Sequence, residues 1–437
     1  MRTGFTDGVK AMTHQDSPLG TAPVGKLVLQ LAIPAMLAQF VNILYSVVDR
    51  MYVGHIANAG DAALAAVGSC VALVGIFVNL IVGLSVGPNA VLALLIGQNS
   101  RDEINRTLHT VLTFGAALGA GLMLVGWLSA RPILVLSGTP ESVLDQALLR
   151  IRLSIFIYFL SIPFMVVYNF GAAVLRSYGD SRRPMYYLLL SGTVNVVLNL
   201  FLVIVMQLGV AGVAIATVIS NVLSAVMVIT HLIRRDDDFA FRFRRMRIEK
   251  EPLLRILQIG IPAGIQHMIF AVANLFIQVG INSFDSTIVS GNSAAVNVDN
   301  VIYNVMAAFY TACSTFMGQN WGAGNKDRMM KSYYISLGYS FLIAAVLGVG
   351  FLLCGEPFLY IFTNDADVVA AGMERMQIMC FSYCISAFMD CTIAACRGIG
   401  RSFVPTIIVI LGSCVFRVVW VYTLFAHFHT IPSLYLL

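Results

Sequence analysis

Long apolar runs separated by short polar segments dominate the pattern of this chain. A helix that crosses a bilayer needs about 20 apolar residues, and eleven stretches of the sequence reach that length. They lie at about 27–49, 62–96, 105–128, 146–175, 185–207, 210–233, 253–282, 287–317, 329–354, 367–396 and 402–426. The pattern therefore predicts an all-α integral membrane protein.

Composition agrees with a membrane location and argues against a soluble enzyme. Of the 437 residues, 58% are hydrophobic and 11% are charged, whereas soluble domains are about 25% charged. The eight cysteines lie in or beside apolar runs and lack the paired spacing of disulfide or zinc frameworks, so we interpret them as small buried hydrophobes. No HExxH motif, P-loop or Cys/His cluster is present, which argues against catalysis and against a metal or organic cofactor.

Basic residues indicate the orientation. Lys and Arg gather in the N-terminal segment and in alternate loops near 98–106, 176–184, 234–255, 320–331 and 397–401. Cytoplasmic loops carry such an excess, so the N-terminus is expected inside the cell. We interpret 1–26 as a cytoplasmic segment and 234–252 as a basic linker between 27–233 and 253–437. A lipid-headgroup or regulatory site in the linker stays open as an alternative.

Three short motifs recur in the same order in the two halves. Residues 30–34 (QLAIP) return as 258–262 (QIGIP), 97–99 (GQN) as 318–320, and 176–184 (RxxGxSxxP) as 397–405. Because an even number of spans separates equivalent points, the repeat is parallel, about an axis along the membrane normal. The fold expected is two six-helix lobes related by a pseudo-two-fold.

The repeat also predicts a twelfth span. An offset of 221 residues relates the third motif pair, and it places the counterpart of the sixth span at about 431–454, past Leu437. We expect that the sequence lacks this helix. A natural protein with eleven spans is the alternative.

These motifs resemble the multidrug and toxic compound extrusion (MATE) family over nearly the whole chain. The most specific stretches are 291–299 (GNSAAVNVD), 318–323 (GQNWGA) and the turn at Arg397, with 212–217 (GVAIAT) in support. The resemblance implies a monomer in the bacterial inner membrane that exports drug-like molecules. It also implies alternating access between two lobes, with Na⁺ or H⁺ entering as drug leaves.

A cation site is expected in the first half. At ~1.5 Å per residue, Asn195, Asn199 and Thr217 lie ~16 to 22 Å above the inner surface of the membrane, and the two asparagines share a helix face. Asp49, near the outer end of the first span, has the right charge to join them. Asp49, Asn195, Asn199 and Thr217 also match the site positions of MATE relatives, except that Asn199 stands where many have aspartate. One carboxylate among oxygen ligands suits Na⁺ or H⁺, and Asp49 pairing with Arg50 or capping its helix is the alternative.

The second half contributes Asp299, Asp390 and Arg417 as intramembrane charges. Counted along their helices, Asp299 and Asp390 lie ~10 to 12 Å from Arg417 in depth, so either carboxylate is a possible partner. The unpaired one is the better candidate for contact with a cationic substrate, and a purely structural ion pair is the alternative.

Two prolines and one histidine complete the set of residues singled out. Pro34 and Pro262 each remove a helical hydrogen bond, so a hinge in the first and seventh spans is expected, with a static kink as the alternative. His267 is interpreted as a packed side chain rather than a ligand.

The function predicted is a cation-coupled efflux antiporter for amphipathic organic cations, bound to lipid and not to nucleic acid. A flippase for lipid-linked precursors is the alternative, although the small number of intramembrane bases besides Arg417 argues against a pyrophosphate site. A passive channel or scaffold, and a membrane enzyme, are less favoured.

Overall fold

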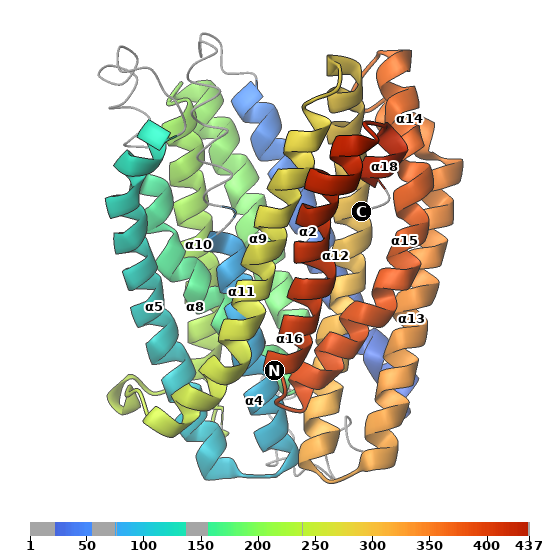
Figure 1. The fold of residues 1–437 in the computed structure, drawn as a ribbon. Coiled ribbons are helices and arrows are strands. Elements are labelled where there is room, and N and C mark those ends of the chain that lie inside the picture. The colour runs from blue at the N-terminus through green and yellow to red at the C-terminus, as the bar shows by residue number, and fades with distance from the viewer. Residues whose placement is uncertain (1–21, 55–74, 76, 137–155, 238, 436–437) are drawn as a thin grey trace, which may run out of the picture.

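The computed structural model describes residues 22–54, 75, 77–136, 156–237 and 239–435, without the side chains of 42–54, 129–136, 210, 433 and 434. Within these ranges the fold is helical, and the long helices run side by side (Figure 1). The first half contains α2 (Val24–Gly54), α4 (Val86–Gly97), α5 (Arg101–Leu136), α8 (Ile162–Ser177), α9 (Arg182–Asn199), the π-helix η1 (Leu200–Val205) and α10 (Val210–Ile233).

After the short 3-10 helix η2 (Phe243–Arg245), the second half begins with α11 (Lys250–Ile281). It continues with α12 (Ser286–Gly322), α13 (Lys326–Leu353), α14 (Gly355–Leu359), α15 (Ala366–Gly398), α16 (Phe403–Val409), η3 (Ile410–Val415), α17 (Phe416–Trp420), η4 (Val421–Phe425) and α18 (Ile431–Tyr435). The predicted all-α fold with two lobes is therefore confirmed.

Ten helical stretches in the described ranges are long and apolar enough to cross a membrane. They correspond to ten of the eleven expected spans, although the first parts of those predicted at 62–96 and 146–175 lie outside the described residues. The remaining expected span, 287–317, is the helix α12, which has 37 residues but is not among the ten. Its residues are largely buried, from Gly291 to Asn320, because α12 packs against α2, α4, α13 and α15.

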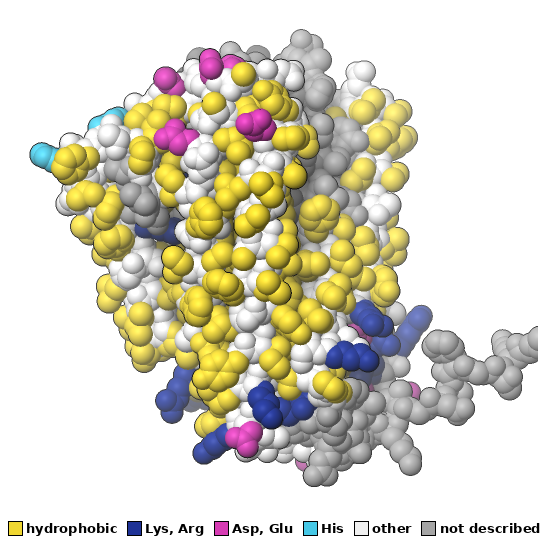
Figure 2. Space-filling model, turned by 90° about the vertical axis from the view of Figure 1, so that its right-hand side faces the viewer, with side chains coloured by type: hydrophobic (Ala, Val, Ile, Leu, Met, Phe, Trp, Pro, Cys, Tyr) yellow, Lys and Arg dark blue, Asp and Glu magenta, His cyan; other side chains and the backbone are white. Residues whose placement is uncertain are grey.

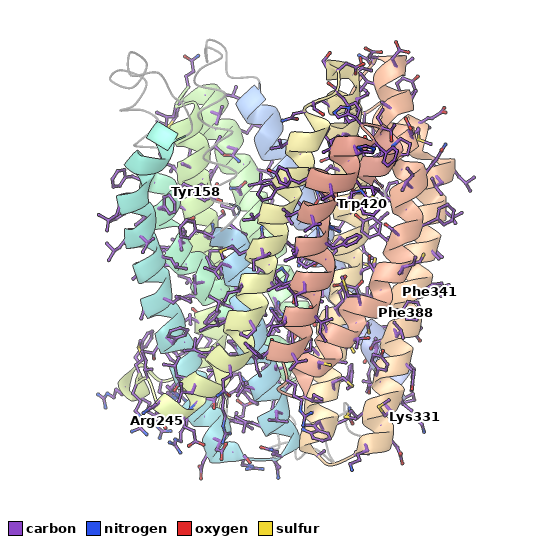
Figure 3. The ribbon with its side chains drawn as sticks, in the orientation of Figure 1. Tyr158, Arg245, Lys331, Phe341, Phe388 and Trp420 are labelled. Carbon is purple, nitrogen blue, oxygen red and sulfur yellow. The ribbon has the colours of Figure 1, made fainter. Side chains whose placement is uncertain are left out.

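Charge divides the two ends of the molecule. On the face shown in Figure 2, hydrophobic side chains cover the middle, most Lys and Arg lie toward one end together with some acidic residues, and Asp and Glu mark the other end. We call the first the basic end. Arg245 and Lys331 lie at this end, and Tyr158 and Trp420 lie toward the opposite one (Figure 3).

The turn motifs of the repeat have the same geometry in both lobes. Gly179 and Gly400 both have positive φ, at 96° and 86°, which glycine adopts without a steric penalty. Each donates its backbone N–H to the carbonyl three residues earlier, on Arg176 and Arg397, at 2.9 Å. The GQN motifs differ, because the first ends α4 whereas the second continues inside α12.

The lobes touch through α4, which packs against α11 and α12. A Cβ atom on Gly97 would lie 2.1 Å from the backbone oxygen of Gln319, and one on Gly322 would lie 2.2 Å from that of Leu94. Only glycine permits so close an approach. Gln319 also donates from Nε2 to the Ser177 carbonyl at 2.5 Å. The basic end of the molecule is therefore closed by direct contact between the lobes.

Four of the cysteines are buried, in line with the interpretation as small hydrophobes: Cys313, Cys380, Cys391 and Cys414. Cys354 is exposed and departs from it, while Cys70 lies outside the described residues.

Candidate functional site

The two asparagines of α9 form a buried amide pair. Asn195 is 6% exposed and Asn199 is fully buried. Asn199 donates from Nδ2 to Oδ1 of Asn195 at 3.1 Å, as their spacing of four residues allows. Buried amides with this geometry offer carbonyl oxygens as acceptors or cation ligands.

A hydrogen-bonded chain links this pair to α10. Asn195 donates from Nδ2 to the hydroxyl of Ser220 at 3.4 Å, and Ser220 donates to the Thr217 carbonyl at 2.9 Å. The Thr217 hydroxyl donates to the carbonyl of Val213 in its own helix, which leaves its oxygen lone pairs for another partner. Sequence reasoning missed Ser220, although its spacing of three residues from Thr217 puts both on one face of α10.

The helix that carries Asp49 packs along α9. Helix α2 contacts both α9 and α10, so the backbone of the acidic residue belongs to a helix beside the amide pair. The helix runs to Gly54, five residues past Asp49, and the Asp49 side chain lies outside the described residues.

A π-helix begins directly after Asn199 and has a counterpart in the second lobe. The offset of 221 residues brings Leu200, the first residue of η1, onto Val421, the first residue of η4. The same offset places Phe416 and Trp420 at the positions of Asn195 and Asn199. The two lobes share this backbone feature, which is frequent at functional sites, but the amide pair belongs to the first lobe.

In the second lobe Asp299 pairs with Arg375, which sequence reasoning overlooked. Arg375 of α15 donates from Nη2 to the Asp299 carboxylate and from Nη1 to Oδ1 of Asn292, both on α12. The Asp299 and Arg375 side chains are only 13% and 10% exposed. The expectation that Arg417 is a possible partner of Asp299 is therefore wrong. The signal was available, because Arg375 interrupts the apolar stretch 367–396 at a depth near that of Asp299.

Arg417 turns toward α11 instead. Its Nη1 donates to Oδ1 of Asn274 at 3.3 Å, and its guanidinium lies 5.7 Å from the ring centroid of Phe270. Asp390, on α15, is half-buried, and within the described ranges it has no hydrogen bond or salt bridge. Arg397 and Arg417 are the basic groups near enough to act on it electrostatically.

His267 lies on α11 next to Gln266, which accepts a hydrogen bond from Nη2 of the buried Arg397 at 2.8 Å. His267 itself makes no hydrogen bond to any described residue. The pair Gln266 and Arg397 fastens the end of α15 to the middle of α11.

Both prolines lie inside continuous helices, Pro34 in α2 and Pro262 in α11. Each is close to the contact between the lobes. Leu31 and Ala32 pack with Phe309 and Phe316 of α12, next to Pro34. A Cβ atom on Gly83 would lie 2.6 Å from the Cα of Gly264, two residues past Pro262.

Comparison with known proteins identifies the family. The MatE family model matches residues 34–201 and 262–423, once in each half of the chain. The chain belongs to the MATE family. The protein is accordingly a multi-pass membrane transporter and not an enzyme.

Relatives of this MATE protein have more than one described role. The Probable multidrug resistance protein YpnP of Bacillus subtilis is 29% identical over 363 residues, which is 82% of this chain and 79% of that protein. An FAD transporter of Shewanella oneidensis is 25% identical over 358 residues, which is 80% of this chain and 76% of its own.

Solved structures share the fold. An outward-facing conformation of a multidrug resistance MATE family transporter superposes with a TM-score of 0.88 at 22% identity. The match covers 97% of this chain and 93% of that one.

Proposed function

We propose that this MATE protein exports small amphipathic organic cations from the cytoplasm, as a monomer in a bacterial inner membrane, by exchange with Na⁺ or H⁺. The buried amide chain of α9 and α10, packed beside the helix that bears Asp49, carries the proposal. Polar groups inside a membrane are costly and persist where they line a pathway or hold an ion. Amide, hydroxyl and carboxylate oxygens are the ligands that hard cations prefer.

Asp49 supplies the charge in this scheme, and Asn195, Asn199 and Thr217 supply neutral oxygens. Na⁺ binds to the ionised carboxylate, whereas H⁺ neutralises it. Either ion changes the net charge beside α2, the helix that contains Pro34. A ligand shifts a conformational equilibrium only by its difference in affinity for the two states.

The closed contact at the basic end corresponds to one of the two states of an alternating-access cycle. By the positive-inside rule this end faces the cytoplasm, so the conformation described here is closed on the inside. Cation binding from outside would then favour opening of the contact among α4, α11 and α12. Pro34 and Pro262, both beside this contact, are the proposed hinges.

Asp390 is the proposed acidic contact for a cationic substrate. Since Arg375 neutralises Asp299, Asp390 is the one of these two carboxylates that is left without a salt bridge in the described ranges. Arg417 lies near enough to attenuate its charge, so a bound cation would compete with that arginine.

The flippase alternative needs basic side chains to hold a pyrophosphate. The second lobe has more buried arginines than the sequence count assumed, yet Arg375 is held by Asp299 and Arg397 by Gln266. Arg417 in turn donates to Asn274, so all three bases are engaged with protein groups, which favours the export of cations.

Transport in proteoliposomes tests the proposal. Ethidium efflux should follow an imposed Na⁺ or pH gradient, and swapping the two gradients identifies the ion. Asp49→Asn should abolish the gradient response. Asp285→Asn is the matched control, because it makes the same change at the N-cap of α12, where asparagine caps equally well.

Three outcomes would contradict the proposal. These are wild-type protein that ignores both gradients, gradient-driven efflux that survives Asp49→Asn, and a preference for flavin dinucleotide over ethidium. The last would replace the cationic substrate class with an anionic one.

A further inference from the structure

The basic linker folds into a defined structure at the edge of the first lobe. Phe241 is 2% exposed and stacks on His109 of α5 with ring centroids 5.3 Å apart. The backbone N–H of Arg242 donates to Nε2 of His109 at 3.1 Å, and that of Glu249 donates to the Thr110 hydroxyl at 3.3 Å. The linker is therefore fastened to α5 at two points.

A cavity of about 1210 Å³ lies between this linker and the start of α5. Its walls contain four carboxylates and six arginines, the latter being Arg101, Arg106, Arg242, Arg244, Arg245 and Arg247. The excess of guanidinium groups makes it a cavity for an anion.

The acidic side chains of the cavity are mostly engaged. Glu249 forms salt bridges with Arg106 and Arg247, the latter at 2.5 Å, and Asp237 pairs with Arg235. The guanidinium of Arg106 donates a hydrogen bond to Glu249 and holds the pKa of this carboxyl below its usual range. The guanidinium groups of Arg244 and Arg245, by contrast, make no hydrogen bond or salt bridge to any described residue. Two arginines thus face the cavity with their donors available.

Apolar side chains alternate with these arginines along the linker. Phe243, Met246 and Ile248 are 63%, 42% and 46% exposed. In Figure 1 the linker lies at the lower left, at the outer edge of the molecule beside α5 and α11, and Figure 3 places Arg245 at that edge. Exposed apolar side chains interleaved with arginines are typical of segments that lie in the headgroup region of a bilayer.

We propose that this cavity binds the phosphate headgroup of an anionic phospholipid from the adjacent leaflet. Arg244 and Arg245 contact the phosphate as hydrogen-bond donors, while Phe243, Met246 and Ile248 enter the interface beside the acyl chains. A free phosphate would use the same arginines but would gain nothing from the three apolar side chains. The site lies at the edge of the first lobe and is lined by residues that the proposed cation site does not use.

Native mass spectrometry of the full-length protein in neutral detergent tests the site. The probes are phosphatidylglycerol, phosphatidylcholine and inorganic phosphate. Wild type should bind phosphatidylglycerol in preference to phosphatidylcholine. At roughly fivefold per arginine at a membrane surface, R244Q/R245Q should weaken phosphatidylglycerol binding roughly thirtyfold.

Two further variants test whether binding depends on these particular arginines and on the apolar side chains beside them. R182Q/R401Q removes two exposed arginines elsewhere at the basic end and should bind phosphatidylglycerol as wild type does. F243S/M246S should weaken phosphatidylglycerol binding and leave any phosphate binding unchanged. All variants change exposed side chains, and unchanged melting temperatures verify that they fold.

The proposal is overturned if R244Q/R245Q retains wild-type affinity, or if R182Q/R401Q loses as much affinity. It is also overturned if inorganic phosphate displaces phosphatidylglycerol at equal concentration, since the site would then serve a free anion.

Discussion

Replacing Gly97 with alanine should shift the protein away from the conformation described here. The added Cβ atom would lie 2.1 Å from the backbone oxygen of Gln319, which is 1.3 Å inside the 3.4 Å at which ordinary contact begins. Backbone atoms of two packed helices cannot yield as a flexible side chain does. Helices α4 and α12 must therefore separate.

The free-energy cost of the added methyl group can be estimated from substitutions in well-packed protein interiors. Inserting a methyl group into a well-packed contact costs about 1–3 kcal/mol. If a state with α4 and α12 apart is free of this cost, the equilibrium moves toward it by roughly 5- to 150-fold. Alanine also favours a helix over glycine by up to about 1 kcal/mol, and this gain is common to both states.

Gly338→Ala in α13 is the matched control. It makes the same chemical change inside a helix, but nothing lies within 4 Å of the added Cβ atom. It should leave the equilibrium unchanged and raise the melting temperature slightly.

Distances between spin labels at Asp102 and Asp327 report the separation of the lobes. Both residues are exposed and lie in the first turns of α5 and α13, at the basic end. In a background without native cysteines, Gly97→Ala should populate a longer distance that wild type and Gly338→Ala lack. Identical distance distributions in all three proteins would refute the reasoning that glycine contact closes this end.

Three further predictions concern polar contacts. Arg375→Met should destabilise the protein by roughly 3–5 kcal/mol because Asp299 stays buried without its partner. Adding Asp299→Asn should recover most of the lost melting temperature. An equal loss of melting temperature in the single and the double variant would contradict the ion pair. Asn199→Leu should raise the ion concentration needed for half-maximal efflux at least about tenfold, because a hydrogen-bonding or ligand group on a charge contributes roughly 1.5–3 kcal/mol. Titration of efflux against ion concentration measures this change. The hydrogen bond from Arg106 lowers the pKa of Glu249 in the folded protein. This salt bridge therefore stabilises the fold fully at pH values above the ordinary glutamate pKa of about 4.3, and the stabilisation is lost as the pH falls through the pKa of the folded state. Hydrogen exchange of 239–249 should therefore rise only in acid, and an equal rise near neutrality would count against the salt bridge.

The features that the sequence predicted correctly are those that depend on a single helix. Hydropathy located ten of the spans, and the spacing of Asn195 and Asn199 put both on one face of α9, where they bond to each other. Length and periodicity are properties of a single segment, so they can be read without knowing its neighbours. α12 was recognised as a helix for the same reason, although its environment is protein on most sides.

Contacts between helices were harder, because they depend on how each helix is rotated about its axis. Depth along the helices did not decide which of two carboxylates pairs with Arg417. In the structure Asp299 pairs with Arg375, and Arg417 donates to Asn274. Ser220 escaped notice because a serine in an apolar helix commonly bonds its own backbone. Its second role, accepting from Asn195, requires α9 and α10 to meet at that level.

The repeat explains why the candidate cation site belongs to one lobe. Duplicated halves begin with equivalent positions, and the turns at Gly179 and Gly400 still match in φ and in hydrogen bonding. At the level of the amide pair they differ, because Phe416 and Trp420 replace the two asparagines. Aromatic side chains cannot supply the carbonyl oxygens that an ion requires. Under the proposed cation coupling, an ion bound beside α9 would therefore act on the two lobes unequally, and this asymmetry would let one charge bias the contact between them.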